Sequence, residues 1–204
     1  MNFLDKGNDE TKEMPRWEGG NFNNYRDWLR YTDLINGVIL LDETIREYSA
    51  SAILSEIRDI KRRKLHEVNV VISSPGGGAY YAFAIYDALR ELSEKGIKVK
   101  AVVQGWAASA AAMIVLQAAD ERIAYPSARF LVHECRRWVF FAVERSSDLK
   151  DEVKEMDAIT ERIFEIMSNR CKKTREEIHS LIERKEIWMS ANEAKDWGLI
   201  DKIL

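Results

Sequence analysis

The sequence predicts an α/β fold, because segments typical of strands and segments typical of helices alternate along most of the chain. Short apolar runs typical of buried strands occupy residues 37–41, 68–72, 97–103, 122–125 and 128–133. Amphipathic or alanine-rich segments typical of helices occupy residues 49–60, 79–92, 109–119, 148–170 and 174–185. The chain has 204 residues, which is enough for one sizeable domain or two small ones.

The first half of the chain shows both periodicities clearly. The run Gly37 to Leu41 is continuously apolar, as expected of a buried strand. In the segment 49–60, isoleucines at 53, 57 and 60 fall on one helical face. Val68 to Ile72 predicts the next strand, and the segment 79–92 again places apolar residues at helical spacing.

The second half continues the alternation and ends in well-marked helices. Strands are predicted at 97–103, 122–125 and 128–133, with a turn at Pro126. Residues 148–170 form a long amphipathic pattern. Thr174 and Ser190 each stand three residues before a glutamate, which is the spacing of a capping box at a helix start. The last helix is expected to end at Gly198.

The N-terminal region differs in composition from the rest. Residues 1–34 are polar and mixed in charge, and up to about residue 22 we expect a flexible segment. The arm nevertheless carries Trp17, Tyr25, Trp28 and Tyr31, so we expect part of it to dock on its own body or on a neighbouring subunit. We therefore divide the chain into an arm, residues 1–34, and a domain, residues 35–204.

The overall composition excludes several classes of function. The net charge of −3 argues against a general affinity for nucleic acid or an anionic membrane, and no apolar run approaches the roughly 20 residues of a membrane span. The N-terminus lacks the apolar core of a signal peptide. The two cysteines of the chain, Cys135 and Cys171, form no CxxC motif and do not have the spacing of metal ligands. We expect a cytoplasmic protein without a metal or other cofactor.

A single serine, Ser109, lies in a run of small residues from Gly105 to Ala112. The pattern predicts a strand, a tight glycine turn and a buried helix that begins near the serine. Free backbone N–H groups at a helix start can stabilise a negative oxygen, so Ser109 is a candidate nucleophile. Alanine-rich runs are also good helix formers, and a serine among them is often purely structural.

Two further sites follow separate predicted strands. Three consecutive glycines, Gly76 to Gly78, follow the strand 68–72 and suit a close approach of backbone to a ligand. The dinucleotide and P-loop fingerprints are absent, which leaves an oxyanion loop or an ordinary turn. His133 ends the strand 128–133 and is either a core histidine or a general base. His66 and His179 lie in polar segments and are poorer candidates.

Four blocks of sequence resemble one family. They are Ser74-Pro75-Gly76-Gly77 with Ala84 to Asp87, Gly105 to Ala110, the stretch from Pro126 to His133, and Ser190 to Asp201. In this order they resemble the proteolytic subunit of the Clp protease (ClpP) and its relatives, which include phage head-maturation proteases. The resemblance covers about residues 35–204.

The resemblance implies a ClpP/crotonase-type spiral of ββα units with a protruding handle made of a strand and a long helix. It also implies a serine endopeptidase in which Ser109 is the nucleophile and His133 the base. The N–H groups of Gly77 and Ala110 would bind the oxyanion. Substrate peptide would lie as a strand between Gly77–Ala79, which includes Gly78, and roughly residues 136–139.

The acid of the triad is the point at which the sequence departs from the family. Counting back from the block Trp188 to Ala191 without gaps places Ile182 at the expected aspartate. Glu183 is the next residue, and a shift of one position would make it the acid that orients His133. Glu186, a backbone carbonyl or a dyad without an acid are the alternatives. The segment after His133 also lacks the glycine-rich turn that is usual in the family.

The resemblance further implies an assembly. Residues 138–143 are a run of large apolar residues, and the family uses this stretch and the long helix after it to join two rings. We expect a homo-oligomer, with heptameric rings as the family's default, whose subunits touch through residues 138–165. Its substrates would be peptides or unfolded proteins, supplied by an AAA+ unfoldase.

Three alternatives to this function remain open. A phage-type head-maturation protease would use the same chemistry. An inactive or catalytically weak scaffold subunit would not need Ser109, His133 and Gly77 together. A crotonase-type enzyme acting on acyl-CoA would use two oxyanion N–H groups and carboxylates without a serine–histidine pair, which is the opposite of what the sequence offers. Labelling of Ser109 by a fluorophosphonate would separate a peptidase from a scaffold.

Overall fold

The computed structural model describes residues 25–135 and 146–204. Within them, the strands form one sheet of seven strands. The strands are β1 (Val38–Leu41), β2 (Glu67–Ser74), β3 (Lys98–Ala108), β4 (Glu121–Ala124), β5 (Arg129–His133), β6 (Glu186–Ser190) and β7 (Lys202–Ile203). The main path runs β1-β2-β3-β4-β7 with all neighbours parallel, while β5 pairs with β3 and, in antiparallel fashion, with β6. The predicted α/β class is confirmed.

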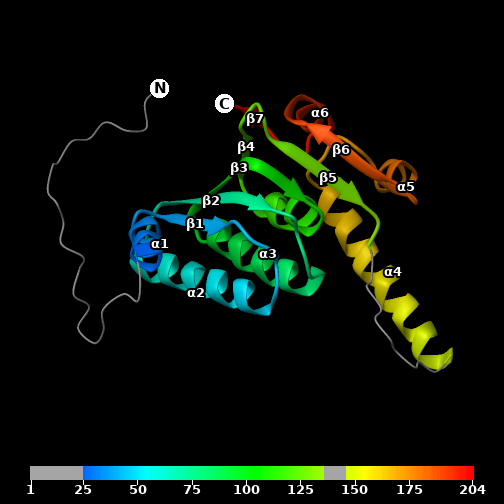
Figure 1. The fold of residues 1–204 in the computed structure, drawn as a ribbon, viewed down its shortest axis with the longest axis horizontal. Coiled ribbons are helices and arrows are strands. Elements are labelled where there is room, and N and C mark those ends of the chain that lie inside the picture. The colour runs from blue at the N-terminus through cyan, green and yellow to red at the C-terminus, as the bar shows by residue number, and fades with distance from the viewer. Residues whose placement is uncertain (1–24, 136–145) are drawn as a thin grey trace, which may run out of the picture.

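The α-helices are α1 (Tyr25–Ile35), α2 (Glu47–Arg63), α3 (Ala79–Glu94), α4 (Ser146–Ser168), α5 (Arg175–Ile182) and α6 (Ala191–Trp197). Helices α2 and α3 connect the first three strands and bury their apolar faces against the sheet. Helices α2 and α3 run side by side along one face of the sheet (Figure 1). Their inward residues, such as Ile53 and Ile57 on α2 and Ile85 and Leu89 on α3, are at most 3% exposed.

Strand β3 is longer than the sequence predicts, and the tight turn expected at Gly105 is wrong. Gly105 lies inside the strand with φ +73°. Before it, Lys100–Val103 pairs with β4, and after it, Trp106–Ala108 pairs with β5. The left-handed conformation at Gly105 therefore lets one strand change its neighbour, because a residue without Cβ adopts positive φ at little cost.

The helix predicted at 109–119 is present in a different form. A π-helical turn, η1 (Ala111–Val115), continues into a 3₁₀ turn, η2 (Leu116–Ala118), and both are completely buried. Wide helical turns of this kind occur often at functional sites. The turn begins two residues after Ser109, whose carbonyl accepts hydrogen bonds from the N–H groups of Ala112 and Met113 at 3.0 and 2.8 Å.

A buried arginine joins this turn to the C-terminal part of the chain. Arg122 is 4% exposed, and its guanidinium donates to both oxygens of the Asp201 carboxylate, to Gln117 Oε1 at 2.7 Å and to the Gly198 carbonyl at 2.9 Å. Burial raises the pKa of the Asp201 carboxyl, but the hydrogen bonds and charge of Arg122, together with the charge of Arg170, outweigh burial, so this pKa lies below its ordinary value. Gln117 in turn donates to the Ala112 carbonyl at 2.8 Å.

Two elements were not anticipated. Helix α1 falls within the predicted arm, and the ion pair of Arg30 with Glu56 on α2 (2.6 Å) ties it to the body of the same chain. Trp17 and the rest of residues 1–24 lie outside the described residues, and the division at residue 35 stays a prediction. Strand β6 was also missed, because its few residues between two helices show no clear alternation of apolar and polar side chains.

The long helix α4 and the predicted helix starts agree with the sequence analysis. Both capping boxes, Thr174 with Glu177 and Ser190 with Glu193, are present. The C-terminal part of α4 is buried in the body, and the rest of the helix protrudes from it (Figure 1). The apolar run 138–143 lies outside the described residues.

Candidate active site

The loop after β2 is held in place by its own serine and by the β1–α2 connection. Ser74 is fully buried; its hydroxyl donates to the Glu43 carbonyl at 2.6 Å and accepts the Gly76 N–H at 3.1 Å. Ile45 donates its N–H to the Gly76 carbonyl at 2.8 Å and accepts the Gly78 N–H at 2.9 Å. Sequence reasoning missed these two roles of Ser74 and Ile45, because they depend on partners about 30 residues away in the chain.

Only glycine fits at two positions of this loop, because a Cβ would overlap neighbouring atoms and because the backbone has positive φ. Gly76 has φ +84°, and a Cβ built there would lie 2.4 Å from the Ala108 carbonyl oxygen and 2.8 Å from the Ala110 nitrogen. Gly77 has φ +152°, and its Cβ would lie 2.2 Å from the Ile45 carbonyl oxygen. The loop therefore lies against the end of β3 without any room for side chains, in agreement with the expectation of a close backbone approach.

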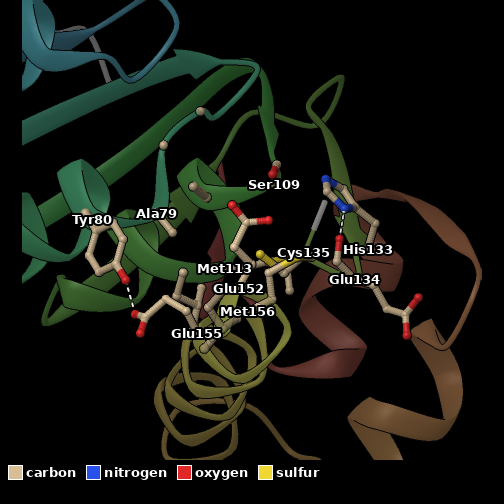
Figure 2. A pocket seen from close by; sticks show the side chains of 15 residues that line it. Ala79, Tyr80, Ser109, Met113, His133, Glu134, Cys135, Glu152, Glu155 and Met156 are labelled. Atoms are coloured by element: carbon tan, nitrogen blue, oxygen red, sulfur yellow. Dashed lines mark hydrogen bonds between the residues drawn. The ribbon is translucent and has the colours of Figure 1, made fainter. Parts of the chain in front are cut away.

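Ser109 lies at the sharp junction between β3 and the buried π-helical turn. Its φ is +54°, which is unusual for a residue with a Cβ and is held by the surrounding structure. Its N–H donates to the Leu131 carbonyl on β5 at 2.8 Å. With its main chain fixed on both sides, the half-buried side chain projects from the turn toward the space beside His133 (Figure 2).

Two backbone N–H groups beside Ser109 have no acceptor among the described residues. These are the N–H groups of Gly77 and Ala110. The two lie near each other, because the Gly76 backbone packs against the Ala110 nitrogen. Paired N–H donors next to a serine hydroxyl are the arrangement that stabilises an oxyanion during acyl transfer.

His133 closes the other side of the site. It ends β5 and is half-buried, and its Nδ1 contacts the backbone carbonyl of Glu134. A carbonyl can only accept, so this contact fits the tautomer that carries its proton on Nδ1, in which Nε2 is the proton acceptor. No hydrogen bond joins the Ser109 hydroxyl to His133 in the described part of the chain, which is common before substrate binds.

Two cavities meet at these residues. One measures about 450 Å³ and the other about 970 Å³, and both are lined by Gly77, Gly78, Ser109 and His133. The smaller cavity extends toward α4, and its lining is shown in Figure 2. The larger cavity extends toward the β1–α2 connection and Trp106. The candidate residues therefore form the boundary between two recesses. This is the arrangement expected of a site in which a substrate peptide extends to both sides of a nucleophile.

In the described part of the chain, no hydrogen bond or ion pair joins Glu183 to His133, and Glu183 lines neither cavity. Glu183 is exposed at the end of α5, where its N–H donates to the His179 carbonyl. Glu186, in contrast, lies directly opposite His133 in the β5–β6 register. Directly opposite residues in antiparallel strands have Cβ atoms about 5 Å apart on the same face. The role of Glu183 as the acid stays a prediction, and Glu186 is the carboxylate that the register favours.

The described residues offer no other obvious reactive centre. They include no group of three or more His, Cys, Asp or Glu side chains that could hold a metal ion. Burial raises the pKa of both free thiols, that of Cys171 to about 11, which keeps them protonated. No helix in the described ranges is long and apolar enough to cross a membrane.

Comparison with known proteins shows the family of this chain. Residues 25–204 match the family model described as Clp protease. The chain belongs to the Clp protease family. The match includes α1, so the family's likeness begins before residue 35. It makes the chain a member of a peptidase family and agrees with the fold class inferred from the resemblance.

Individual relatives are similar at modest identity. The ATP-dependent Clp protease proteolytic subunit 1 of Chlamydia muridarum is 32% identical over 168 residues, covering 81% of this chain and 85% of the relative. The proteolytic subunit of Porphyromonas gingivalis is 27% identical over 173 residues, covering 84% of this chain and 75% of the relative. Subunit 3 of Rhizobium etli is 27% identical over 197 residues, covering 96% and 93%.

The crowding at Gly76 leads to a prediction about stability. Gly96→Ala should lower the free energy of unfolding by about 1–2 kcal/mol through backbone strain alone, since Gly96 also has positive φ but open space around it. Gly76→Ala should cost about 1–3 kcal/mol more, because its Cβ meets backbone atoms that cannot move aside. Denaturant unfolding of the two variants measures the difference. Equal losses would contradict the crowding described here.

Proposed function

We propose that this protein is a serine endopeptidase that cleaves peptides or unfolded proteins, with Ser109 as nucleophile and His133 as general base. The main support is that both side chains lie at the boundary between two cavities, beside the N–H groups of Gly77 and Ala110, which have no acceptor in residues 25–135 and 146–204. The strained backbone at Ser109 also supports the proposal, because such strain is common where a nucleophile is held at a turn.

In this proposal His133 Nε2 accepts the Ser109 hydroxyl proton while the oxygen attacks the scissile carbonyl. The carbonyl oxygen becomes negative and is stabilised by the N–H groups of Gly77 and Ala110. His133 then gives the proton to the leaving amine, which leaves an acyl-enzyme on Ser109. Water, activated by the same imidazole, hydrolyses the ester and restores the serine. Substrate backbone would pair as an added strand beside Gly77–Ala79.

The group that orients His133 completes the proposal. We propose that a carboxylate takes this role when substrate is bound, either Glu183, at the position nearest to that expected from the resemblance, or Glu186, which lies opposite His133. The Glu134 carbonyl, which contacts Nδ1, would then be replaced by the carboxylate. A carboxylate stabilises the imidazolium more strongly than a carbonyl does, because it carries a full negative charge.

The proposal includes an assembly. Leu149 and Val153 are 49% and 58% exposed and stand four residues apart on the protruding part of α4. An apolar pair exposed on an isolated helix favours contact with another subunit. We therefore propose a homo-oligomer, heptameric by resemblance, that encloses the active sites. The relatives are named ATP-dependent subunits, so we propose an ATP-driven unfoldase as partner, in the cytoplasm.

Removal of the nucleophile tests the proposed chemistry. Ser109→Ala should lower peptide hydrolysis by roughly three or more powers of ten and abolish labelling by a fluorophosphonate. Ser127→Ala, at an exposed turn, is the matched control and should retain both. Hydrolysis that persists in Ser109→Ala, with unchanged circular dichroism in both variants, would contradict the assignment.

Glutamine variants test the orienting carboxylate. If Glu186 orients His133, Glu186→Gln should reduce kcat by about tenfold or more, because Gln keeps the shape and loses the charge. The same loss in Glu183→Gln would assign the role to Glu183. Glu94→Gln, on the exposed end of α3, is the control. Full activity in both test variants would leave the Glu134 carbonyl as the orienting group and would refute a carboxylate.

Charges placed on α4 test the assembly. Leu149→Glu combined with Val153→Glu should lower the mass measured by light scattering, because burying two new carboxylates in an interface is costly. Leu204→Glu makes the same kind of change at the exposed chain end and should leave the mass unchanged. A wild-type chain that is a folded monomer at micromolar concentration would exclude the oligomer.

A further inference from the structure

A glutamine side chain is completely buried beside the π-helical turn η1. Gln117 lies in the 3₁₀ turn η2 and is 0% exposed, although most glutamine side chains lie at protein surfaces. Its neighbours in the chain, residues 110–116 and 118–119, are all apolar. Because a buried amide is costly unless its donors and its acceptor are paired, the partners of this side chain indicate its role.

Both ends of the Gln117 amide are paired. Its Oε1 accepts a hydrogen bond from the Arg122 guanidinium at 2.7 Å. Its Nε2 donates to the Ala112 carbonyl at 2.8 Å and to the Leu199 carbonyl at 3.3 Å. The side chain therefore joins the middle of the π-helical turn to the C-terminal segment and to the buried arginine.

Arg122 determines which way this amide faces. A guanidinium can only donate and a carbonyl can only accept. If the amide were rotated by half a turn, its NH₂ group would face the guanidinium and its oxygen would face two carbonyls. The guanidinium is itself fixed, because its Nε donates to the Asp201 carboxylate at 3.0 Å and another of its nitrogens donates to the Gly198 carbonyl at 2.9 Å. The NH₂ group of Gln117 is thus held toward Ala112.

Ala112 links the amide to the peptide group that follows the nucleophile. Its carbonyl accepts from Gln117, and its N–H donates to the Ser109 carbonyl at 3.0 Å. The Met113 N–H donates to the same carbonyl at 2.8 Å. Because a peptide group is planar and trans, the Ser109 carbonyl and the Ala110 N–H point in opposite directions. The bonds that fix the Ser109 carbonyl therefore also fix the direction of the Ala110 N–H.

The direction of this N–H affects the reaction more than it affects binding of the substrate. An oxyanion donor acts on an oxygen that becomes negative only as the reaction proceeds, and loss of one donor lowers kcat by about 10²–10³-fold. The second donor, at Gly77, lies on a loop held by Ser74 and Ile45 instead. A change at Gln117 should therefore weaken one of the two donors and leave the other in place.

We propose that Gln117 is a positioning residue for the oxyanion donor at Ala110, and that Arg122 holds its amide in the required orientation. The side chain acts through the Ala112 carbonyl and touches no substrate, since it is completely buried. The inference rests on the proposed peptidase function and adds to it a residue that sets the geometry of the transition-state site.

Gln117→Met tests this role, because methionine has nearly the same length and shape but no N–H to donate to Ala112. Both kcat and kcat/KM should fall about tenfold or more with KM nearly unchanged, which is the signature of an interaction made only in the transition state. The inhibition constant of a peptide boronate, whose tetrahedral adduct with Ser109 places an oxygen at the oxyanion position, should rise by the same factor. Binding of an uncleaved peptide to Ser109→Ala should be equal with and without Gln117→Met.

Two control variants separate this role from a general loss of stability. Gln104→Met makes the same substitution at an exposed position of β3 and should leave kcat and boronate inhibition unchanged. Thr174→Ala removes the side-chain cap of α5, so it lowers stability away from the site, and it should also leave both measurements unchanged.

The outcomes separate this inference from the proposed function. An unchanged kcat, or a loss of ground-state peptide affinity as large as the loss of kcat/KM, would overturn the inference and leave the peptidase intact. If Gln117→Met does not fold, Gln117→Glu, which keeps the acceptor facing Arg122 but loses the donor, repeats the test. Failure of both variants to fold would show that the amide supports the whole fold and would overturn the positioning role. Wild-type protein without hydrolysis or fluorophosphonate labelling would overturn the peptidase itself.

Discussion

The candidate active site depends on how closely the Gly76–Gly77 backbone packs against its neighbours. A Cβ at either glycine would overlap main-chain atoms of the β1–α2 connection or of the end of β3. The buried hydroxyl of Ser74 and the two hydrogen bonds to Ile45 hold the loop in this narrow space. The contact joins the ends of β1, β2 and β3, and it leaves the Gly77 N–H without an acceptor in the described residues.

The change of neighbour within β3 brings β5, which carries His133, next to the end of β3 and the glycine loop. Because Gly105 turns the strand away from β4, its last residues pair with β5, and the Ser109 N–H reaches Leu131. His133 follows two residues later on the same strand. The short separation between Leu131 and His133 then limits how far the imidazole can lie from the serine. One bend inside a strand thus brings the segments that carry the two candidate side chains next to each other.

The two sides of the smaller cavity come from parts of the chain with different degrees of burial. Ser109 and the turn after it belong to the core, where the Arg122 network ties them to the C-terminal segment. Helix α4, which lines the smaller cavity, is buried only near its C-terminal end. Substitutions on the outer turns of α4 can therefore alter what binds beside Ser109 with little cost to the packing of the core.

The sequence by itself determined the α/β class, most strands and helices, both capping boxes, and Ser109, His133 and the glycine loop as candidates. These features can be recognised from local patterns, because apolar periodicity, capping spacing and glycine runs each extend over only a few residues. Only the tertiary structure decided that Gly105 lies within a strand, that β6 sets Glu186 opposite His133, and that residues of α4 line the cavity beside Ser109. Each of these depends on pairing or packing between segments far apart in the chain, whose register and approach follow from the folded arrangement of all the elements.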